Sequence, residues 1–122
     1  MSKNEKYYEI FEKSLQDAGL SKKTIGKHLY NVRLYLDEFI SMHLGGGIEE
    51  GADPINMDGF FGDFYARKCC SSTAELKAAI GSIKRFYKCM KESGYMSEGA
   101  YKDLTASIRD YKEMWIEMFE CM

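Results

Sequence analysis

Apolar residues recur at steps of three and four along most of the chain, which is the spacing of amphipathic helices. The clearest stripe lies between Ser72 and Gly94 and contains Leu76, Ile80, Ile83, Tyr87 and Met90. Ser72 and Glu75 form the sequence pattern of a capping box at its start, and Gly94 suits a left-handed residue at its end. The pattern predicts one long helix over residues 72–94 that buries this stripe.

Two further helices are expected in the first half of the chain. The first covers residues 4–18, with Tyr8, Phe11 and Leu15 on one face, and stops at Gly19. Ser21 should cap the second, which runs to about His43. Its stripe contains Ile25, Leu29, Val32, Leu36, Phe39 and His43. We expect this helix, like the others, to hold the helix over 72–94.

The second half of the chain supplies the remaining elements. Asp58 should cap a short third helix over residues 59–70, rich in aromatic side chains, and Ser97 should cap a last helix over 97–120. No segment alternates apolar and polar residues over a useful length, so no strand is expected. The sequence therefore predicts an all-α domain over residues 1–122, a bundle of four helices with a fifth, C-terminal helix.

The segment between these halves, LGGGIEEGADPINM, should form a connector without helix, because it holds four glycines and the only proline of the chain. A run of three glycines could also cradle a phosphate. However, the P-loop pattern GxxxxGK[ST] does not occur, and no strand precedes the run. A flexible connector is the favoured interpretation.

Composition limits the class of protein. The 122 residues are 45% hydrophobic and 14% aromatic, which is enough for one core and too apolar for a disordered chain. Apolar runs are too short to cross a bilayer, and the first twenty residues mix both signs of charge without the features of a signal peptide. We expect a cytoplasmic protein that does not enter a membrane.

Charge is unevenly distributed, although 17 basic and 19 acidic residues give a net charge of -2. Residues 72–95 carry five basic side chains against two acidic ones, and residues 21–44 carry four against two. Residues 45–71 and 96–122 are each net acidic by three. Two net basic segments thus alternate with two net acidic ones. This argues against a general polyanion binder and directs attention to one face of the molecule.

No constellation typical of an enzyme or metal site is visible. Cys69, Cys70, Cys89 and Cys121 do not have the spacing of zinc ligands. Carboxylates lie mostly on solvated helix faces, and no Cys-His pair has a spacing that can be interpreted. We therefore expect no catalysis, no metal and no cofactor, and we interpret Cys89 as a core or boundary residue.

The last helix has an unusually broad apolar face. Leu104, Ile108, Tyr111, Trp115 and Met118 follow the helical step, and Phe119 widens the stripe. Such a face either completes the bundle or forms a docking surface, in this chain or with a second copy. The candidate interaction residues are Trp115, Met118 and Phe119.

Two motifs in this order resemble a known family. Residues 19–40, GLSKKTIGKHLYNVRLYLDEFI, open with the Leu-Ser-x-x-Thr turn of Leu20, Ser21 and Thr24. Residues 82–96 carry the Ser-x-x-x-Phe-Tyr run of Ser82, Phe86 and Tyr87. Over roughly residues 5–96 the chain resembles the N-terminal core-binding, or SAM-like, domain of tyrosine recombinases and phage integrases, with 97–120 as an additional helix.

This resemblance implies a four-helix bundle that clamps one side of duplex DNA, with its second and fourth helices against the phosphate backbone and major groove. Those helices correspond to the two basic segments. The DNA-contacting residues expected from the match are Ser21, Lys22, Lys23, Thr24, Lys27, Lys77, Lys84, Arg85 and Lys88. His28 and Tyr30 lie near the same turn and could reach sugars or base edges. The implied process is DNA integration or recombination.

The chain also departs from the family. It contains no R...HxxR constellation, and Tyr101 and Tyr111 have no clustered basic partners in sequence, so the strand-cleaving chemistry of the family is not expected. Two hypotheses remain. One is a DNA-binding module without catalysis, acting on duplex DNA alone or beside a partner recombinase. The other is a protein-interaction or self-association domain that uses the last helix.

Overall fold

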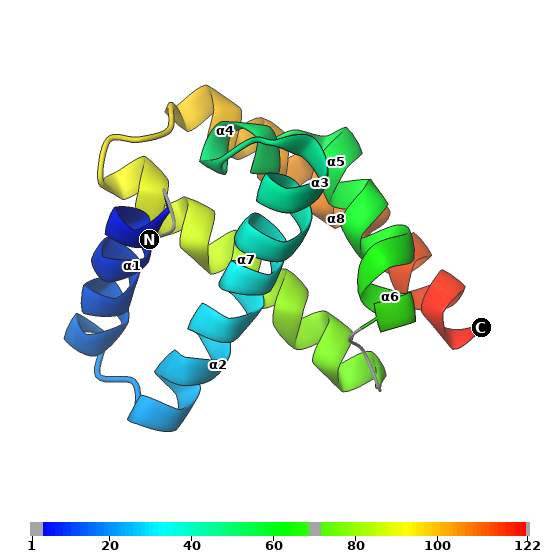
Figure 1. The fold of residues 1–122 in the computed structure, drawn as a ribbon, viewed down its shortest axis with the longest axis horizontal. Coiled ribbons are helices and arrows are strands. Elements are labelled where there is room, and N and C mark those ends of the chain that lie inside the picture. The colour runs from blue at the N-terminus through cyan, green and yellow to red at the C-terminus, as the bar shows by residue number, and fades with distance from the viewer. Residues whose placement is uncertain (1–3, 69–71, 122) are drawn as a thin grey trace.

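The computed structural model describes residues 4–68 and 72–121, and all regular structure in these residues is helical, as predicted (Figure 1). Predicted helix 4–18 is α1 (Glu5–Asp17). The elements that follow are α2 (Lys22–Arg33), the π-helical η1 (Leu34–Ser41), α3 (Met42–Leu44), α4 (Ile48–Gly51), α5 (Pro54–Gly59), the π-helical η2 (Phe60–Phe64), α6 (Tyr65–Lys68), α7 (Thr73–Glu92) and α8 (Glu98–Glu120).

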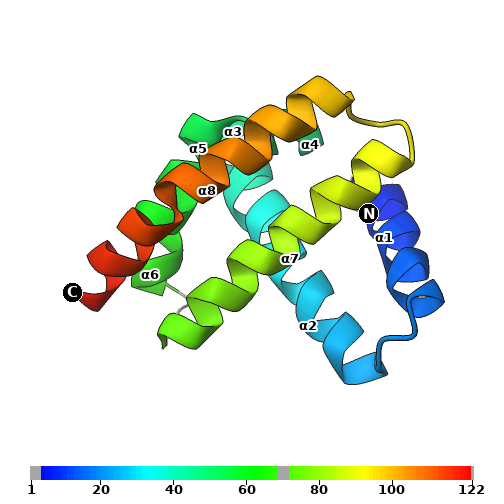
Figure 2. The same cartoon turned by 180° about the vertical axis from the view of Figure 1, so that it is seen from behind.

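The helix α7 lies at the centre of the arrangement. It packs against α1 and α2 on one side and against α8 on the other, and Figures 1 and 2 both show it crossing α2. The helices α1 and α2 form an antiparallel pair, joined at Gly19 in the left-handed conformation (φ 81°). The segments α4 to α6 and the helix α8 enclose the other end of the core.

The prediction for α7 is confirmed in its stripe and at both ends. Its five predicted stripe residues are all buried, at 3% exposure or less. The Ser72 hydroxyl accepts a hydrogen bond from the Glu75 N–H. Gly94 has a φ of 86°, and the Tyr95 N–H donates to the Met90 carbonyl, as in a Schellman motif. The caps at Ser21 and Ser97 are confirmed in the same way.

The long second helix is continuous through α2, η1 and α3, but its predicted stripe is wrong beyond Leu36. In η1 the helix winds more widely than an α-helix, so residues four apart stay on one face. Val32, Leu36 and Ile40 are therefore buried on one face, with Tyr35 buried beside them. His43, predicted on the stripe, is exposed, and its ring lies at the edge of the aromatic cluster, 5.4 Å from the Phe64 ring.

The prediction of a connector without helix between residues 44 and 57 is wrong. Both α4 and α5 form there, and buried tyrosine hydroxyls bind two backbone carbonyls of α4. The Tyr35 hydroxyl donates to the Gly51 carbonyl at 2.5 Å, and the Tyr87 hydroxyl donates to the Ile48 carbonyl at 2.7 Å. Asp53 caps α5, with Pro54 in its first turn, so the predicted cap at Asp58 is also wrong.

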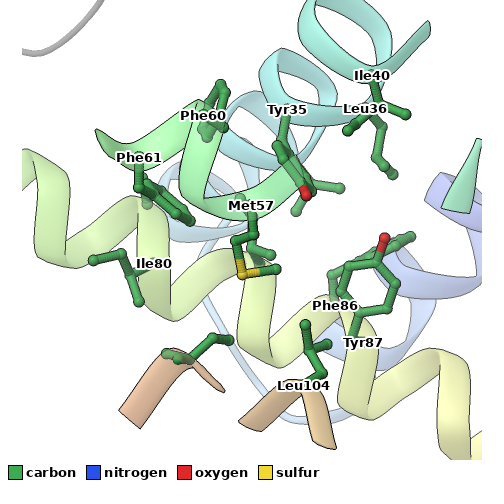
Figure 3. Packing of buried hydrophobic residues seen from close by; sticks show 14 of the residues in the cluster. Tyr35, Leu36, Ile40, Met57, Phe60, Phe61, Ile80, Phe86, Tyr87 and Leu104 are labelled. Carbon is green, nitrogen blue, oxygen red and sulfur yellow. The ribbon is translucent and has the colours of Figure 1, made fainter. Parts of the chain in front are cut away.

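These short helices replace the single third helix of the prediction, and the count of four plus one is not reproduced. They supply an aromatic core. Phe60 lies 4.8 Å from Tyr35 between ring centroids, and Phe61 lies 5.0 Å from Trp115 of α8. Figure 3 shows Phe61 pointing toward the side chain of Ile80 on α7, with Phe60 farther from it. Aromatic pairs of this kind stabilise the fold by about 0.5–1.5 kcal/mol beyond their buried area.

Other expectations can be compared with the described part of the chain. No helix among residues 4–68 and 72–121 is both long enough and apolar enough to cross a membrane. Cys89 is buried and Cys121 is exposed, and both are free thiols, while Cys69 and Cys70 lie outside the described residues. No group of three or more metal-ligating side chains occurs among the residues that the structure describes.

Candidate nucleic-acid interface

The helices α2 and α7 enclose a groove of about 820 Å³ between them. Five of the residues predicted to contact DNA line it, two from α2 and three from α7. They are Thr24, Lys27, Lys84, Arg85 and Lys88. The packing of α2 against α7 buries the apolar seams of both helices and leaves their basic edges at the groove. Cations that are far apart in sequence therefore share one surface.

A second hollow of about 670 Å³ continues along the same two helices. It is lined by Lys23 and Tyr30 of α2, and it shares Lys27, Asn31 and Ala78 with the groove. Together the two hollows extend from Ala74 to Glu92 of α7. At a rise of 1.5 Å per residue this stretch of α7 is about 27 Å long. We refer to these two adjoining hollows together as the channel.

The basic residues at this surface are available for a ligand. Within the described residues, no ion pair involves any of the lysines or the arginine predicted to contact DNA. Only Glu75 and Glu92 contribute carboxylates to the lining of the two hollows, one in each. By contrast, Arg33 and Arg67 are each held by a carboxylate, Glu5 at 2.8 Å and Asp63 at 2.7 Å. The channel therefore carries a net positive charge that its own side chains leave largely uncompensated.

The remaining predicted DNA contacts lie at or beyond the margins of this channel. The Ser21 hydroxyl accepts from the Thr24 N–H at 3.2 Å and lies 3.0 Å from the Thr24 hydroxyl. Lys22 follows at the exposed start of α2, and Lys77 lies exposed on α7. Neither of these lysines lines the two hollows. They can add long-range attraction for an anion but are not part of the channel wall.

A polar cluster that the sequence reasoning did not recognise joins α2 to α7 at the groove. The Ser82 hydroxyl is buried and lies 2.8 Å from His28 Nδ1 and 3.0 Å from Asn31 Nδ2. The same hydroxyl is 3.0 Å from the Ala78 carbonyl, one turn back on α7. A detectable signal was present, because His28 and Asn31 both fall on the border between the apolar stripe of α2 and its basic edge.

Hydrogen-bond counting fixes the proton of the His28 ring. The Asn31 amide can only donate to the Ser82 hydroxyl, and the Ala78 carbonyl can only accept from it. All three contacts are satisfied together when His28 donates from Nδ1 and Ser82 donates to Ala78. Burial and the nearby Arg85 guanidinium lower the pKa of His28, so its second nitrogen, Nε2, carries no proton at neutral pH.

Tyr101 of α8 lies at one end of the groove, with the Lys91 ammonium 4.8 Å from its ring centroid. A tyrosine nucleophile needs a lowered pKa to form its phenolate. Burial and the charge of Glu92 instead raise the pKa of the Tyr101 hydroxyl. The environment of Tyr101 therefore favours the neutral phenol, which can stack or donate a hydrogen bond.

The predicted interaction residues of α8 differ in how deeply they are buried. Trp115 is 1% exposed, and its indole N–H donates to the Asp58 carboxylate at 2.6 Å. Phe119 is half-buried against the core. Met118 is 45% exposed and shares an outer face with Tyr111 and Met114. Trp115 thus belongs to the core of this chain, and only the outer face is accessible to a partner.

Comparison of the chain with protein-family models, with curated proteins and with solved structures found no match. The geometry described above is therefore the basis for assigning a function.

Proposed function

We propose that this protein is a DNA-binding module without catalysis, which contacts duplex DNA along the channel between α2 and α7. The observation that carries the proposal is the shared groove of Lys27 from α2 with Lys84, Arg85 and Lys88 from α7. Basic side chains that neutralise phosphates dominate the affinity of proteins for DNA. A net acidic chain that keeps such a cluster free of ion pairs supports binding at one face rather than general attraction to polyanions.

The resemblance to the core-binding domain of tyrosine recombinases and phage integrases is consistent with this proposal. It rests on Leu20, Ser21 and Thr24 at the start of α2 and on Ser82, Phe86 and Tyr87 of α7. In the structure Ser21 caps α2, and Phe86 and Tyr87 are buried in the core. We interpret the chain as a SAM-like helical domain that lies beside a recombinase on DNA or acts alone.

The proposal is tested by titrating a labelled DNA duplex with the protein at increasing salt concentration. Each phosphate contact contributes about -0.9 to the slope of log K against log salt. We expect the variant Lys84→Glu with Lys88→Glu to weaken binding and to reduce the magnitude of this slope by about two, because two contacts are lost. The measurement is fluorescence anisotropy at several salt concentrations.

A matched control is Lys102→Glu with Lys112→Glu on α8, which changes the net charge by the same amount at two residues that do not line the channel. This variant should weaken binding less and should leave the slope close to that of the wild type. Absence of duplex binding at low salt would discard the proposal. Equal losses in the two double variants would show that net charge, and not the channel, determines affinity.

A second candidate function is self-association through the outer face of α8. The observation in its favour is that Tyr111, Met114 and Met118 are 44%, 40% and 45% exposed on one helix. Apolar side chains gathered on one helix face are typical of protein interfaces. Sedimentation of the wild type beside Met114→Glu with Met118→Glu decides this function, and a monomer at all concentrations for both proteins would count against it.

A further inference from the structure

One ring nitrogen in the groove has no hydrogen-bond partner among the residues that the structure describes. His28 Nδ1 is engaged by Ser82, and no hydrogen bond to Nε2 occurs within residues 4–68 and 72–121. Within the described residues, no buried side-chain nitrogen or oxygen lacks a partner. Since Nε2 has none, it is accessible to solvent, and His28 is one of the residues that line the groove. An accessible nitrogen of this kind can exchange a proton with a ligand.

The groups around this nitrogen are mostly cationic. From α2 the charged neighbour at the groove is Lys27, and from α7 they are Lys84, Arg85 and Lys88, with Glu92 towards one end. The other titratable groups at the groove are the thiol of Cys89 on α7 and the phenol of Tyr101 on α8, while α1 contributes the uncharged Ser14. These cations oppose a positive charge on the His28 ring.

A bound anion would instead favour the protonated His28 ring. It neutralises the neighbouring cations, and one of its oxygens can accept a hydrogen bond from Nε2 only when that nitrogen is protonated. Protonation requires no rearrangement of the cluster, because Nδ1 already donates to Ser82 in the neutral ring. The site is therefore built to accept a proton and an anion together.

We propose that His28 takes up a proton when a phosphate group enters the groove, so that Nε2–H joins Lys27 and Arg85 in holding the anion. The phosphate belongs either to a DNA backbone or to a free anion of the same tetrahedral shape. The first source deepens the function proposed above and rests on it, whereas the second does not require DNA binding. Proton uptake and anion affinity are linked, so each strengthens the other by the same factor.

The first test follows the ring nitrogens of the wild-type protein by NMR as the pH is varied. Spectra are recorded without ligand, with sodium sulfate and with a DNA duplex, because sulfate and phosphodiesters keep the same charge between pH 5.5 and 8. A tenfold gain in affinity on protonation corresponds to a rise of about one unit in the pKa of His28. His43 does not line the two hollows, and its ring signals are the internal control for a general effect of each ligand.

The second test uses His28→Asn, in which the amide nitrogen can still donate to Ser82 from the position of Nδ1 but carries no charge at any pH. Wild-type affinity for the duplex should increase as the pH falls from 8 to 5.5. The increase should be largely lost in His28→Asn and retained in the matched variant His43→Asn. Circular dichroism and urea unfolding establish that both variants fold.

The outcomes separate the two proposals. A rise in the pKa of His28 with sulfate but no binding of the duplex supports an anion site and overturns the DNA-binding function. Duplex binding with an unchanged pKa of His28, or with the same pH dependence in His28→Asn, overturns the proton-linked site and leaves the DNA-binding function standing. No duplex binding and no response to sulfate overturns both.

Discussion

The two ends of this molecule are built from different kinds of contact. Where α2 crosses α7, the polar cluster of His28, Asn31 and Ser82 and an open basic groove lie at the surface. Where α5 and η2 meet α8, aromatic rings such as Phe61 and Trp115 fill the interior, and α8 exposes carboxylates beside its apolar outer face. Buried apolar area stabilises a fold strongly, whereas a hydrogen bond contributes only about 0.5–1.5 kcal/mol net.

Under the proposed function, this difference separates the most densely aromatic part of the core from the binding surface. The groove end keeps polar groups and uncompensated charge near its helix contact. Substitutions at the aromatic end should therefore change the free energy of unfolding most, and those at the groove should change binding more than stability.

The largest effect is expected from Trp115→Ala. The substitution removes a fully buried ring and leaves the Asp58 carboxylate without its indole donor. We expect a loss of about 3–5 kcal/mol in the free energy of unfolding, measured by urea denaturation. Met118→Ala, on the exposed face of the same helix, should cost less than about 1 kcal/mol. Similar losses for both variants would contradict the placement of Trp115 in the core.

A smaller loss is expected from Ser82→Ala at the polar crossing. Without the hydroxyl, the His28 and Asn31 donors lose their shared acceptor, at a cost of about 1–3 kcal/mol. Ser107→Ala is the matched control, because the Ser107 hydroxyl also donates one turn back, to the Asp103 carbonyl, but has no cross-helix role in the structure. Its effect should stay within about 0.5 kcal/mol. If the two serine variants unfold at the same urea concentration, the cluster does not stabilise the contact.

The smallest effect is expected from Gly81→Ala in α7, and it has the opposite sign. A Cβ at this position meets no atom within 4 Å, because the residue faces the groove. Alanine should therefore stabilise the helix by about 0.5–1 kcal/mol in a thermal or urea melt. Gly94→Ala is the contrasting control, since its φ of 86° is unfavourable for alanine by about 1–2 kcal/mol. If Gly81→Ala lowered the free energy of unfolding, there would be too little space at the groove wall for an added methyl group.

The sequence predicts the helices well where caps and an α-helical period agree. The caps at Ser21, Ser72 and Ser97 and the buried stripe of α7 follow from side-chain chemistry within one turn. The short helix α4 could not be predicted, because the buried hydroxyls that bind its carbonyls come from other helices. Tyr87, which holds the Ile48 carbonyl, is 39 residues away in sequence. The start of α5 at Asp53 and Pro54 is a local signal that the sequence analysis missed.

The candidate site was predictable in part, because the period of a single helix shows which of its residues share an edge. The helical period places Lys84 and Lys88 on one edge of α7, and it places Lys27 on the border of the α2 stripe. Whether two such edges face one another depends on how the helices cross, which no local pattern determines. The bond between His28 and Ser82 joins residues 54 apart and could not be read from either helix alone.

The π-helical segment η1 has a consequence for related chains. In η1 the backbone accommodates one residue more than an α-helical path needs. If this segment kept its length but wound as a regular α-helix, α3 would rotate by about 100° relative to α2 and His43 would turn inward, because the extra residue would no longer be absorbed. A relative that lacks one residue between Leu34 and Ser41 could wind regularly and keep the present direction of α3, so we expect either the π-helical winding or a one-residue deletion wherever the ring cluster is kept.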